Sequence, residues 1–239
     1  NADQVQFGDY TWSRNNKDGV TPLQGIKNRV NKNTAIHYAK GCSLTSLDTS
    51  GIAEAVEAAK NSEVAVIFGG SASAALARDY KSSTCGEGFD LNDLNLTGAQ
   101  SQLIREVYRT GTPVILVLVT GKPFVIEWEK NNLPAILVQW YAGEQAGNSI
   151  ADILFGEVVP SGRLTFSFPR STGHLPVYYK YLPSDRGFYK NPGSYDSPGR
   201  DYVFSAPSAL YSFGYGLSYT SFIYNWIDRK SGSAGMPRP

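Results

Sequence analysis

Over its first 150 residues the chain alternates short apolar segments with amphipathic ones. The apolar segments cover residues 63–68, 113–119 and 134–140. Their nearly continuous apolar character predicts strands buried on both faces, the first of them stopped by glycines at 69 and 70. Apolar residues at helical spacing predict helices over residues 51–59, 97–109 and 147–155. This alternation predicts a three-layer αβα sandwich around a mostly parallel sheet.

Two further elements are expected near the N-terminus. Thr21 is a residue type that caps helices, and Pro22 favours the first helical position, so a helix is expected from there to about residue 30. Residues 34–39 predict another strand. Either Thr49 or Ser50 is expected to cap the helix over residues 51–59.

Between the first and second apolar segments, residues 71–95 show no clear periodicity. A loop of this length inside a compact domain is commonly functional. It contains Glu87, which lies between Gly86 and Gly88, so a mobile backbone can present this carboxylate to a substrate. Glycosidases that use two carboxylates need one protonatable acid. Glu87 is a candidate for that acid, whereas the sequence offers no convincing candidate for its partner.

Other residues of the same loop are weaker candidates. Phe89 is the aromatic residue most readily placed against a sugar ring. Asp90 is a candidate substrate contact, but it equally suits capping the turn or bracing Arg78. Asp79 is a further, weaker alternative to Glu87.

The remaining chemistry-bearing residues favour structural roles. Glu144 lies in a predicted strand-to-helix turn, where backbone amides stabilise a carboxylate. His37 lies on a strand pattern and is expected in the core or at its rim. His174 lies in an irregular region and is also expected to have a structural role. Cys42 and Cys85 are compatible with one disulfide or with two free thiols. Two cysteines and two histidines without ligand-like spacing give no basis for a metal site, and no cofactor is expected.

Charge and hydropathy limit the classes of partner. The chain has 22 basic and 21 acidic residues without a basic run, which argues against nucleic acid or an anionic membrane surface as the main partner. No apolar stretch reaches the ~18 residues that span a bilayer.

The composition of the sequence changes after residue 159. Residues 1–159 are expected to form the sandwich core, and residues 160–229, rich in Pro, Gly, Ser and Tyr, an irregular part of the same domain that leads toward a following domain. Residues 230–239 resemble a linker.

A series of short motifs runs through the chain in a specific order. They include Gly-Asp-Tyr at 8–10, Gly-Glu-Gly-Phe-Asp at 86–90, Trp-Tyr-Ala-Gly-Glu-Gln-Ala-Gly-Asn at 140–148, Pro-Ser-Gly-Arg-Leu at 160–164 and Leu-Tyr-Ser-Phe-Gly-Tyr-Gly-Leu-Ser-Tyr-Thr at 210–220, with others at 21–26, 94–100, 119–123 and 154–156. In this order they resemble the C-terminal α/β-sandwich domain of family 3 glycoside hydrolases, which include β-glucosidases and β-xylosidases.

The resemblance implies a retaining exo-β-glycosidase that removes terminal β-linked sugars from oligosaccharides or glycosides. In such enzymes a separate (β/α)8 barrel carries the aspartate nucleophile, and the sandwich domain often supplies the acid/base from the loop matched here by Glu87. The sequence departs from the family at Leu91, where arginine is common, and at Thr97, where proline is common. An extracellular or periplasmic role in polysaccharide degradation is implied, and a homo-oligomer is compatible with it.

Related domains begin with an apolar strand just before the segment matched by Asn1-Ala2-Asp3. The first strand and the barrel are therefore expected on another chain or on a preceding segment. Two alternatives remain. One is a non-catalytic carbohydrate-binding or scaffold module. The other is a small-molecule or nucleotide-binding doubly wound domain, for which the phosphate loop is lacking.

Overall fold

The computed structural model describes residues 2–11, 13, 15–73, 83–179, 193–199, 202–223 and 225. Three parallel strands, β1 (Ala65–Gly70), β2 (Val114–Val119) and β3 (Ala135–Val138), form a sheet in the order β1-β2-β3. Ile67 is paired with Leu116, and Val117 with Leu137. The structure confirms the predicted parallel sheet.

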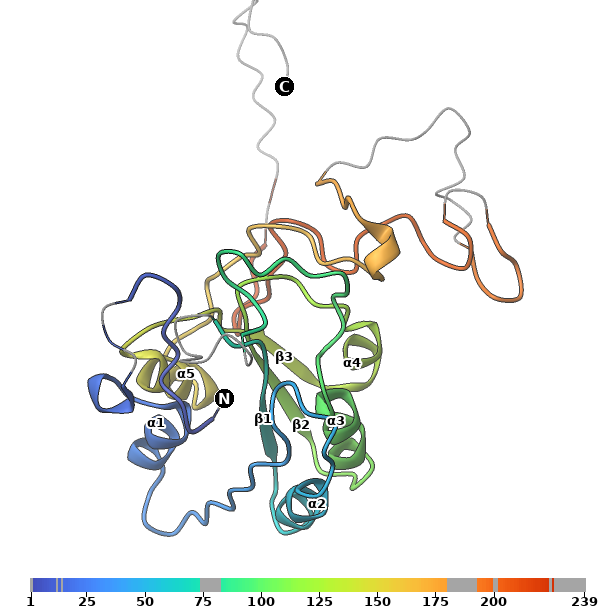
Figure 1. Ribbon diagram of the computed structural model, residues 1–239. Coiled ribbons are helices and arrows are strands. Elements are labelled where there is room, and N and C mark those ends of the chain that lie inside the picture. Colours follow the sequence, from blue (N-terminus) through green and yellow to red (C-terminus); the bar gives the residue numbers. More distant parts are fainter. Residues whose placement is uncertain are drawn as a thin grey trace, which may run out of the picture.

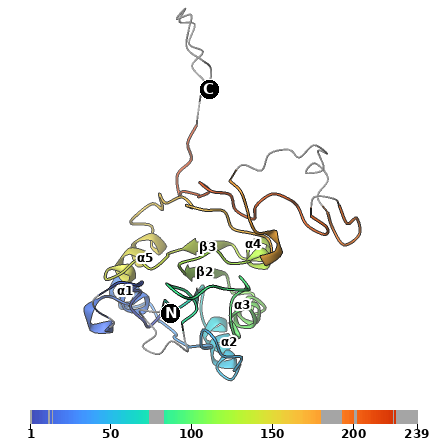
Figure 2. The same ribbon diagram turned by 45° about the horizontal axis from the view of Figure 1, so that its top comes forward.

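Helices flank the sheet on both sides, so the protein is an α/β sandwich. Helices α1 (Pro22–Arg29) and α5 (Ala146–Leu154) lie together on one side, and α2 (Ile52–Lys60) and α3 (Gln100–Tyr108) lie on the other (Figures 1 and 2). The short helix α4 (Glu127–Asn132) precedes β3, and two 3-10 turns span Asn16–Asp18 and Thr172–His174. The main hydrophobic core lies between the sheet and helices α2 and α3, and Ile104, Leu116 and Phe124 are fully buried in it.

The α1–α5 contact brings two backbones together at glycines. A Cβ atom on Gly25 would lie 2.0 Å from the Gly147 carbonyl oxygen, and one on Gly147 would lie 2.2 Å from the Thr21 oxygen. The Gly147 N–H also donates to the Val20 oxygen at 3.0 Å. The N-terminal segment is thus fixed to α5 through atoms that no side-chain rotation moves.

Capping was predicted for two helices, with different outcomes. Thr21 caps α1 as expected, because its Oγ1 accepts from the Gln24 N–H at 3.1 Å. At α2 the cap position is Gly51, without a side-chain hydrogen bond, so the expected cap at Thr49 or Ser50 is wrong. The Ser50 hydroxyl donates instead to the carboxylate of Asp48 at 3.0 Å.

Two predictions about secondary structure were wrong, and one helix was not predicted. Residues 34–39 are exposed for the most part and pair with no strand in the described chain, so they form an extended connection rather than a strand. Strand β1 continues through Gly69 and Gly70 instead of stopping before them, and residues 65–68 are only half-buried because β1 is an edge strand of the sheet as described. Helix α4 was missed, since six residues show no reliable helical period.

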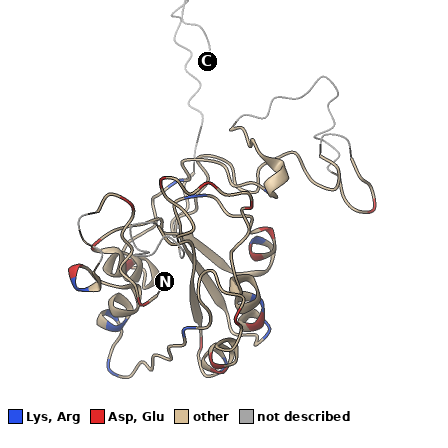
Figure 3. Cartoon of the chain, in the orientation of Figure 1, with Lys and Arg blue, Asp and Glu red and all other residues tan. Residues whose placement is uncertain are grey.

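The C-terminal part supplies residues to the same core. Phe168 and Leu210 are buried within it, and Phe168 pairs with Tyr211 in an isolated antiparallel bridge. The segment 230–239, expected to resemble a linker, lies outside the described residues. Lys and Arg are interspersed with Asp and Glu over the helices (Figure 3). Within the part of the chain that is described, no helix is long and apolar enough to cross a membrane.

Candidate active site

The segment that carries Glu87 starts beside the carboxyl end of β1. After the strand, the Ala72 N–H donates to Thr84 Oγ1, and the Ala72 oxygen accepts from the N–H groups of Thr84 and Cys85 at 3.0 and 3.2 Å. Ser73 and Cys85 form a parallel bridge. The residues just before Glu87 are therefore fixed to the edge where open α/β sheets bind their ligands.

Glu87 itself is exposed and stands in a tight turn. The Phe89 N–H donates to the Gly86 oxygen at 3.1 Å, and Gly86 and Gly88 have φ angles of +119° and +77°. These left-handed conformations favour glycine, which explains the glycine on each side of Glu87. The Glu87 backbone N–H donates to Asp9 Oδ2 at 2.8 Å, across 78 residues of chain. The turn leaves the Glu87 carboxylate facing solvent.

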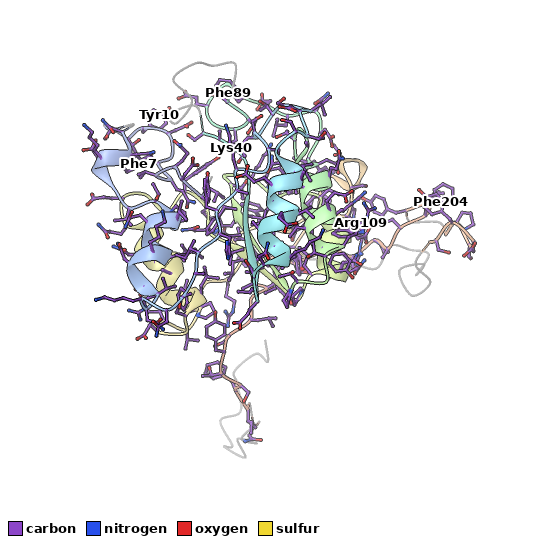
Figure 4. All side chains as sticks on the ribbon, turned by 90° about the horizontal axis from the view of Figure 1, so that it is seen from below. Phe7, Tyr10, Lys40, Phe89, Arg109 and Phe204 are labelled. Atoms are coloured by element: carbon purple, nitrogen blue, oxygen red, sulfur yellow. The ribbon has the colours of Figure 1, made fainter. Side chains whose placement is uncertain are left out.

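The other two candidates of the loop differ in burial. Phe89 is half-buried and Asp90 is exposed. Figure 4 places Phe89 at the same edge of the molecule as Tyr10, an 85% exposed tyrosine with a φ of +62°. Asp79, the weaker alternative to Glu87, and Arg78, which Asp90 was suggested to brace, lie outside the described residues.

A polar cluster lies beneath the loop, and sequence reasoning missed it. The Tyr141 hydroxyl lies 2.7 Å from Cys85 Sγ and 2.8 Å from Ser71 Oγ, which also donates to Thr120 Oγ1 at 3.2 Å. A Cβ atom on Gly121 would lie 3.2 Å from the Tyr141 ring. Burial raises the pKa of Tyr141 well above its usual value of about 10, and the hydrogen bond with Cys85 adds to this rise. The hydroxyl therefore remains protonated and links β1 to the start of the loop.

This raised pKa predicts a pH dependence of stability. The unfolded tyrosine loses its proton near pH 10, whereas the folded one holds it, so the stabilisation is complete below pH 10 and is lost as the pH rises toward the folded pKa. The loss approaches at most about 1.4 kcal/mol per pH unit. Tyr141→Phe should cost about 1 kcal/mol of unfolding free energy at pH 8, from lost hydrogen bonds, and less at pH 11.

Urea unfolding of wild type and Tyr141→Phe at pH 8, 10 and 11 measures this difference. Other tyrosines are common to both proteins, so their titration cancels in the comparison. Two curves that stay parallel over this range would show that Tyr141 is not buried as described.

The remaining candidates are two cysteines, a glutamate and a histidine. Cys42 and Cys85 are free thiols, so of the two alternatives left open the disulfide is not formed. Glu144 is exposed, and its backbone oxygen accepts from the Val20 N–H. His37, expected in the core or at its rim, is instead exposed because residues 34–39 join no sheet.

His174 is buried and has a partner for each ring nitrogen. Its Nδ1 accepts from the Arg170 N–H at 3.3 Å, and its Nε2 lies 3.0 Å from the Pro207 oxygen. The ring also contacts Tyr202 edge-on, with centroids 4.6 Å apart. These contacts give His174 a structural role, as the sequence predicted.

The described residues hold no cluster suited to a metal ion, and a hollow along β3 lies away from the Glu87 loop. Among the described residues, no group of three or more His, Cys, Asp or Glu side chains is placed to hold a metal ion. A hollow of about 800 Å³ lies along β3, and its lining includes Val138, Trp140 and Tyr211 but none of Glu87, Phe89 and Asp90. The hollow is therefore separate from the candidate loop.

Comparison with known proteins identifies the family. The family model for the glycosyl hydrolase family 3 C-terminal domain matches residues 1–219. This chain therefore belongs to the glycosyl hydrolase family 3 C-terminal domain family. It is 42% identical over 205 residues to a β-xylosidase of Formosa agariphila, covering 86% of this chain and 26% of that protein. It is 40% identical over 226 residues to a periplasmic β-glucosidase of Salmonella typhimurium, covering 85% of this chain and 28% of that protein.

Solved structures agree with this assignment. A β-glucosidase of Erythrobacter marinus matches with a TM-score of 0.74 and 34% identity over 92% of this chain and 30% of that chain. A β-glucosidase of Listeria innocua in complex with isofagomine matches with a TM-score of 0.71 and 29% identity over 91% of this chain and 28% of that chain. The chain thus spans less than a third of the length of these relatives.

Proposed function

We propose that this chain is the C-terminal domain of a retaining exo-β-glycosidase of the β-glucosidase or β-xylosidase type, and that Glu87 is its general acid/base. The single observation that carries the proposal is the geometry of Glu87. This exposed carboxylate stands in a glycine-flanked turn at the carboxyl edge of the parallel sheet, and its backbone N–H is bound by Asp9. Membership of the family supports the reaction class.

The proposed chemistry follows two displacements. In the first, Glu87 donates a proton to the glycosidic oxygen while a second carboxylate attacks the anomeric carbon and forms a glycosyl-enzyme. In the second, Glu87 takes a proton from water, which attacks the same carbon and releases the sugar with its β configuration retained. No metal or organic cofactor enters either step.

The second carboxylate is proposed to lie outside this chain. An aspartate on a (β/α)8 barrel, on another segment or another chain, would face Glu87 with the two carboxyl groups about 5–5.5 Å apart. The exposure of Glu87 fits such an arrangement, since a partner domain that covers the loop would exclude water from the site. We assign Phe89 to a stacking contact with a sugar ring and Asp90 to a polar contact beside it. A periplasmic location, as the name of the Salmonella relative gives for that protein, or an extracellular one completes the proposal.

The stereochemistry of the product tests this function in the complete protein. We expect turnover of aryl β-glucosides or β-xylosides, and NMR should detect the β-anomer of the released sugar before mutarotation. Release of the α-anomer first would contradict the double displacement. Sugar binding without turnover would favour the alternative, a non-catalytic carbohydrate-binding module.

A further inference from the structure

A half-buried carboxylate lies directly against the backbone of the Glu87 loop. Asp9 Oδ2 accepts the Glu87 N–H at 2.8 Å, while Asp9 Oδ1 accepts a hydrogen bond from the Ser73 hydroxyl. Ser73 follows β1 and forms a bridge with Cys85, so the carboxylate joins the fixed end of the sheet to the turn. One side chain thus connects three segments that are distant in sequence.

The turn is shaped to admit this carboxylate. A Cβ atom on Gly86 would lie 2.5 Å from Asp9 Oδ2, and Gly86 has a φ of +119°. Any other residue here would push the carboxylate away from the Glu87 N–H. The glycine therefore permits the close approach of Asp9, as well as the backbone conformation of the turn.

The segment that carries Asp9 is itself fixed to the rest of the fold. The Gly143 N–H donates to the Gln6 oxygen at 2.9 Å, which fixes the N-terminal segment to the turn after β3. A Cβ atom on Gly8 would lie 3.4 Å from Tyr141 Cβ, so this segment packs on the Tyr141 side chain. The anchor of Asp9 is thus the same tyrosine that supports the start of the Glu87 loop.

We propose that Asp9 is a positioning residue for Glu87. By accepting the hydrogen bond from the Glu87 N–H, Asp9 fixes the position and direction of the acid/base carboxylate. This inference rests on the proposed function of Glu87. Proton transfer requires the acid within about 2.6–3.2 Å of the glycosidic oxygen, and a 1 Å misplacement costs on the order of 10²-fold in rate. A turn with glycine on both sides of Glu87 does not set this distance by itself. A hydrogen bond to a charged acceptor is stronger than one between neutral groups, and the one from Asp9 acts on Glu87 itself.

The test compares Asp9→Ala with wild type in the complete enzyme. We expect kcat/KM to fall about 10- to 100-fold on glycosides with poor leaving groups, and much less on activated ones, because only the former need the proton. Binding of a glycone-mimicking inhibitor should stay within about 2-fold, since the substitution removes neither Phe89 nor Asp90, the two assigned sugar contacts. Asp9→Asn keeps one oxygen acceptor, and it should recover most of the loss.

A double-mutant comparison separates positioning from a purely structural role. Adding Asp9→Ala to Glu87→Ala should cause no further loss beyond about 2-fold, because there is no acid left to misplace. A further tenfold loss in the double mutant, or an equal loss on poor and activated leaving groups, would overturn the role of Asp9. Wild-type rates in Asp9→Ala together with a defective Glu87→Ala would also overturn it while leaving the proposed function intact. If Glu87→Ala alone is fully active, the proposed function has failed instead. Should Asp9→Ala not fold, Gly86→Ala, whose Cβ would push the Asp9 carboxylate away from the Glu87 N–H, carries the same comparisons.

Discussion

Replacing Glu87 by alanine in the complete enzyme should lower kcat/KM by roughly 10²- to 10⁴-fold on alkyl glycosides and on aryl glycosides with poor leaving groups. Such leaving groups depart as alkoxides or basic phenoxides unless a proton reaches the glycosidic oxygen. A dinitrophenolate leaves without that proton, so the first step on dinitrophenyl glycosides should be affected only by about tenfold or less. A plot of log kcat/KM against leaving-group pKa measures the effect, and its slope should steepen in the variant.

Glu144→Ala is the matched control for this experiment. Glu144 is also an exposed glutamate, and its backbone contact to Val20 does not depend on the side chain. Its rates should stay within about 2-fold of wild type on both substrate classes, as expected for a surface substitution. A steeper slope in Glu144→Ala than in Glu87→Ala would show that the assignment of the acid to Glu87 is wrong.

The largest expected effect on stability is at the contact of α1 with α5. A Cβ atom on Gly147 would lie 2.2 Å from the Thr21 oxygen and 2.6 Å from the Val20 oxygen, both backbone atoms. Overpacking costs typically 1–3 kcal/mol, and a clash with backbone atoms lies at or above the upper end because no rotamer relieves it. Gly147→Ala should therefore lose at least about 3 kcal/mol of unfolding free energy. At roughly 2–4 °C per kcal/mol, its Tm should fall by at least about 6 °C.

Gly162→Ala is the matched control for the stability prediction. A Cβ atom there meets nothing within 4 Å, and Gly162 has no left-handed φ. Differential scanning calorimetry should give this variant a Tm close to that of wild type. Equal melting temperatures for the two variants would show that α1 and α5 do not approach as closely as described.

Sequence patterns predicted the elements that depend on residues adjacent in the chain. Strand β2 is apolar at every position, and this composition predicts burial on both faces. It is the central strand of the sheet. Helix α1 begins where Thr21 and Pro22 indicate, because capping is a local interaction. Residues 34–39 were assigned wrongly because a strand exists only with a partner, and a sequence pattern does not show whether one is present.

In the candidate site, too, the sequence predicted what adjacent residues determine and missed contacts between distant ones. Glu87 was predicted because its two glycines and its motif are adjacent in sequence. The role of Asp9 was not predictable, since its contacts to Ser73 and Glu87 span 64 and 78 residues. The Tyr141 contacts to Cys85 and Ser71 span 56 and 70 residues and were missed for the same reason. Side chains that position the candidate acid are thus assembled by the fold.

The central claim, that this chain supplies the acid/base through Glu87, is tested most directly by azide rescue. In Glu87→Ala of the complete enzyme, azide should enter the space left by the carboxylate and attack the glycosyl-enzyme, which requires no general base. Its addition should raise the turnover of an activated aryl glycoside and yield the β-glycosyl azide, identified by NMR. Equal loss of activity on activated and poor leaving groups, with no glycosyl azide at any azide concentration, would contradict the claim.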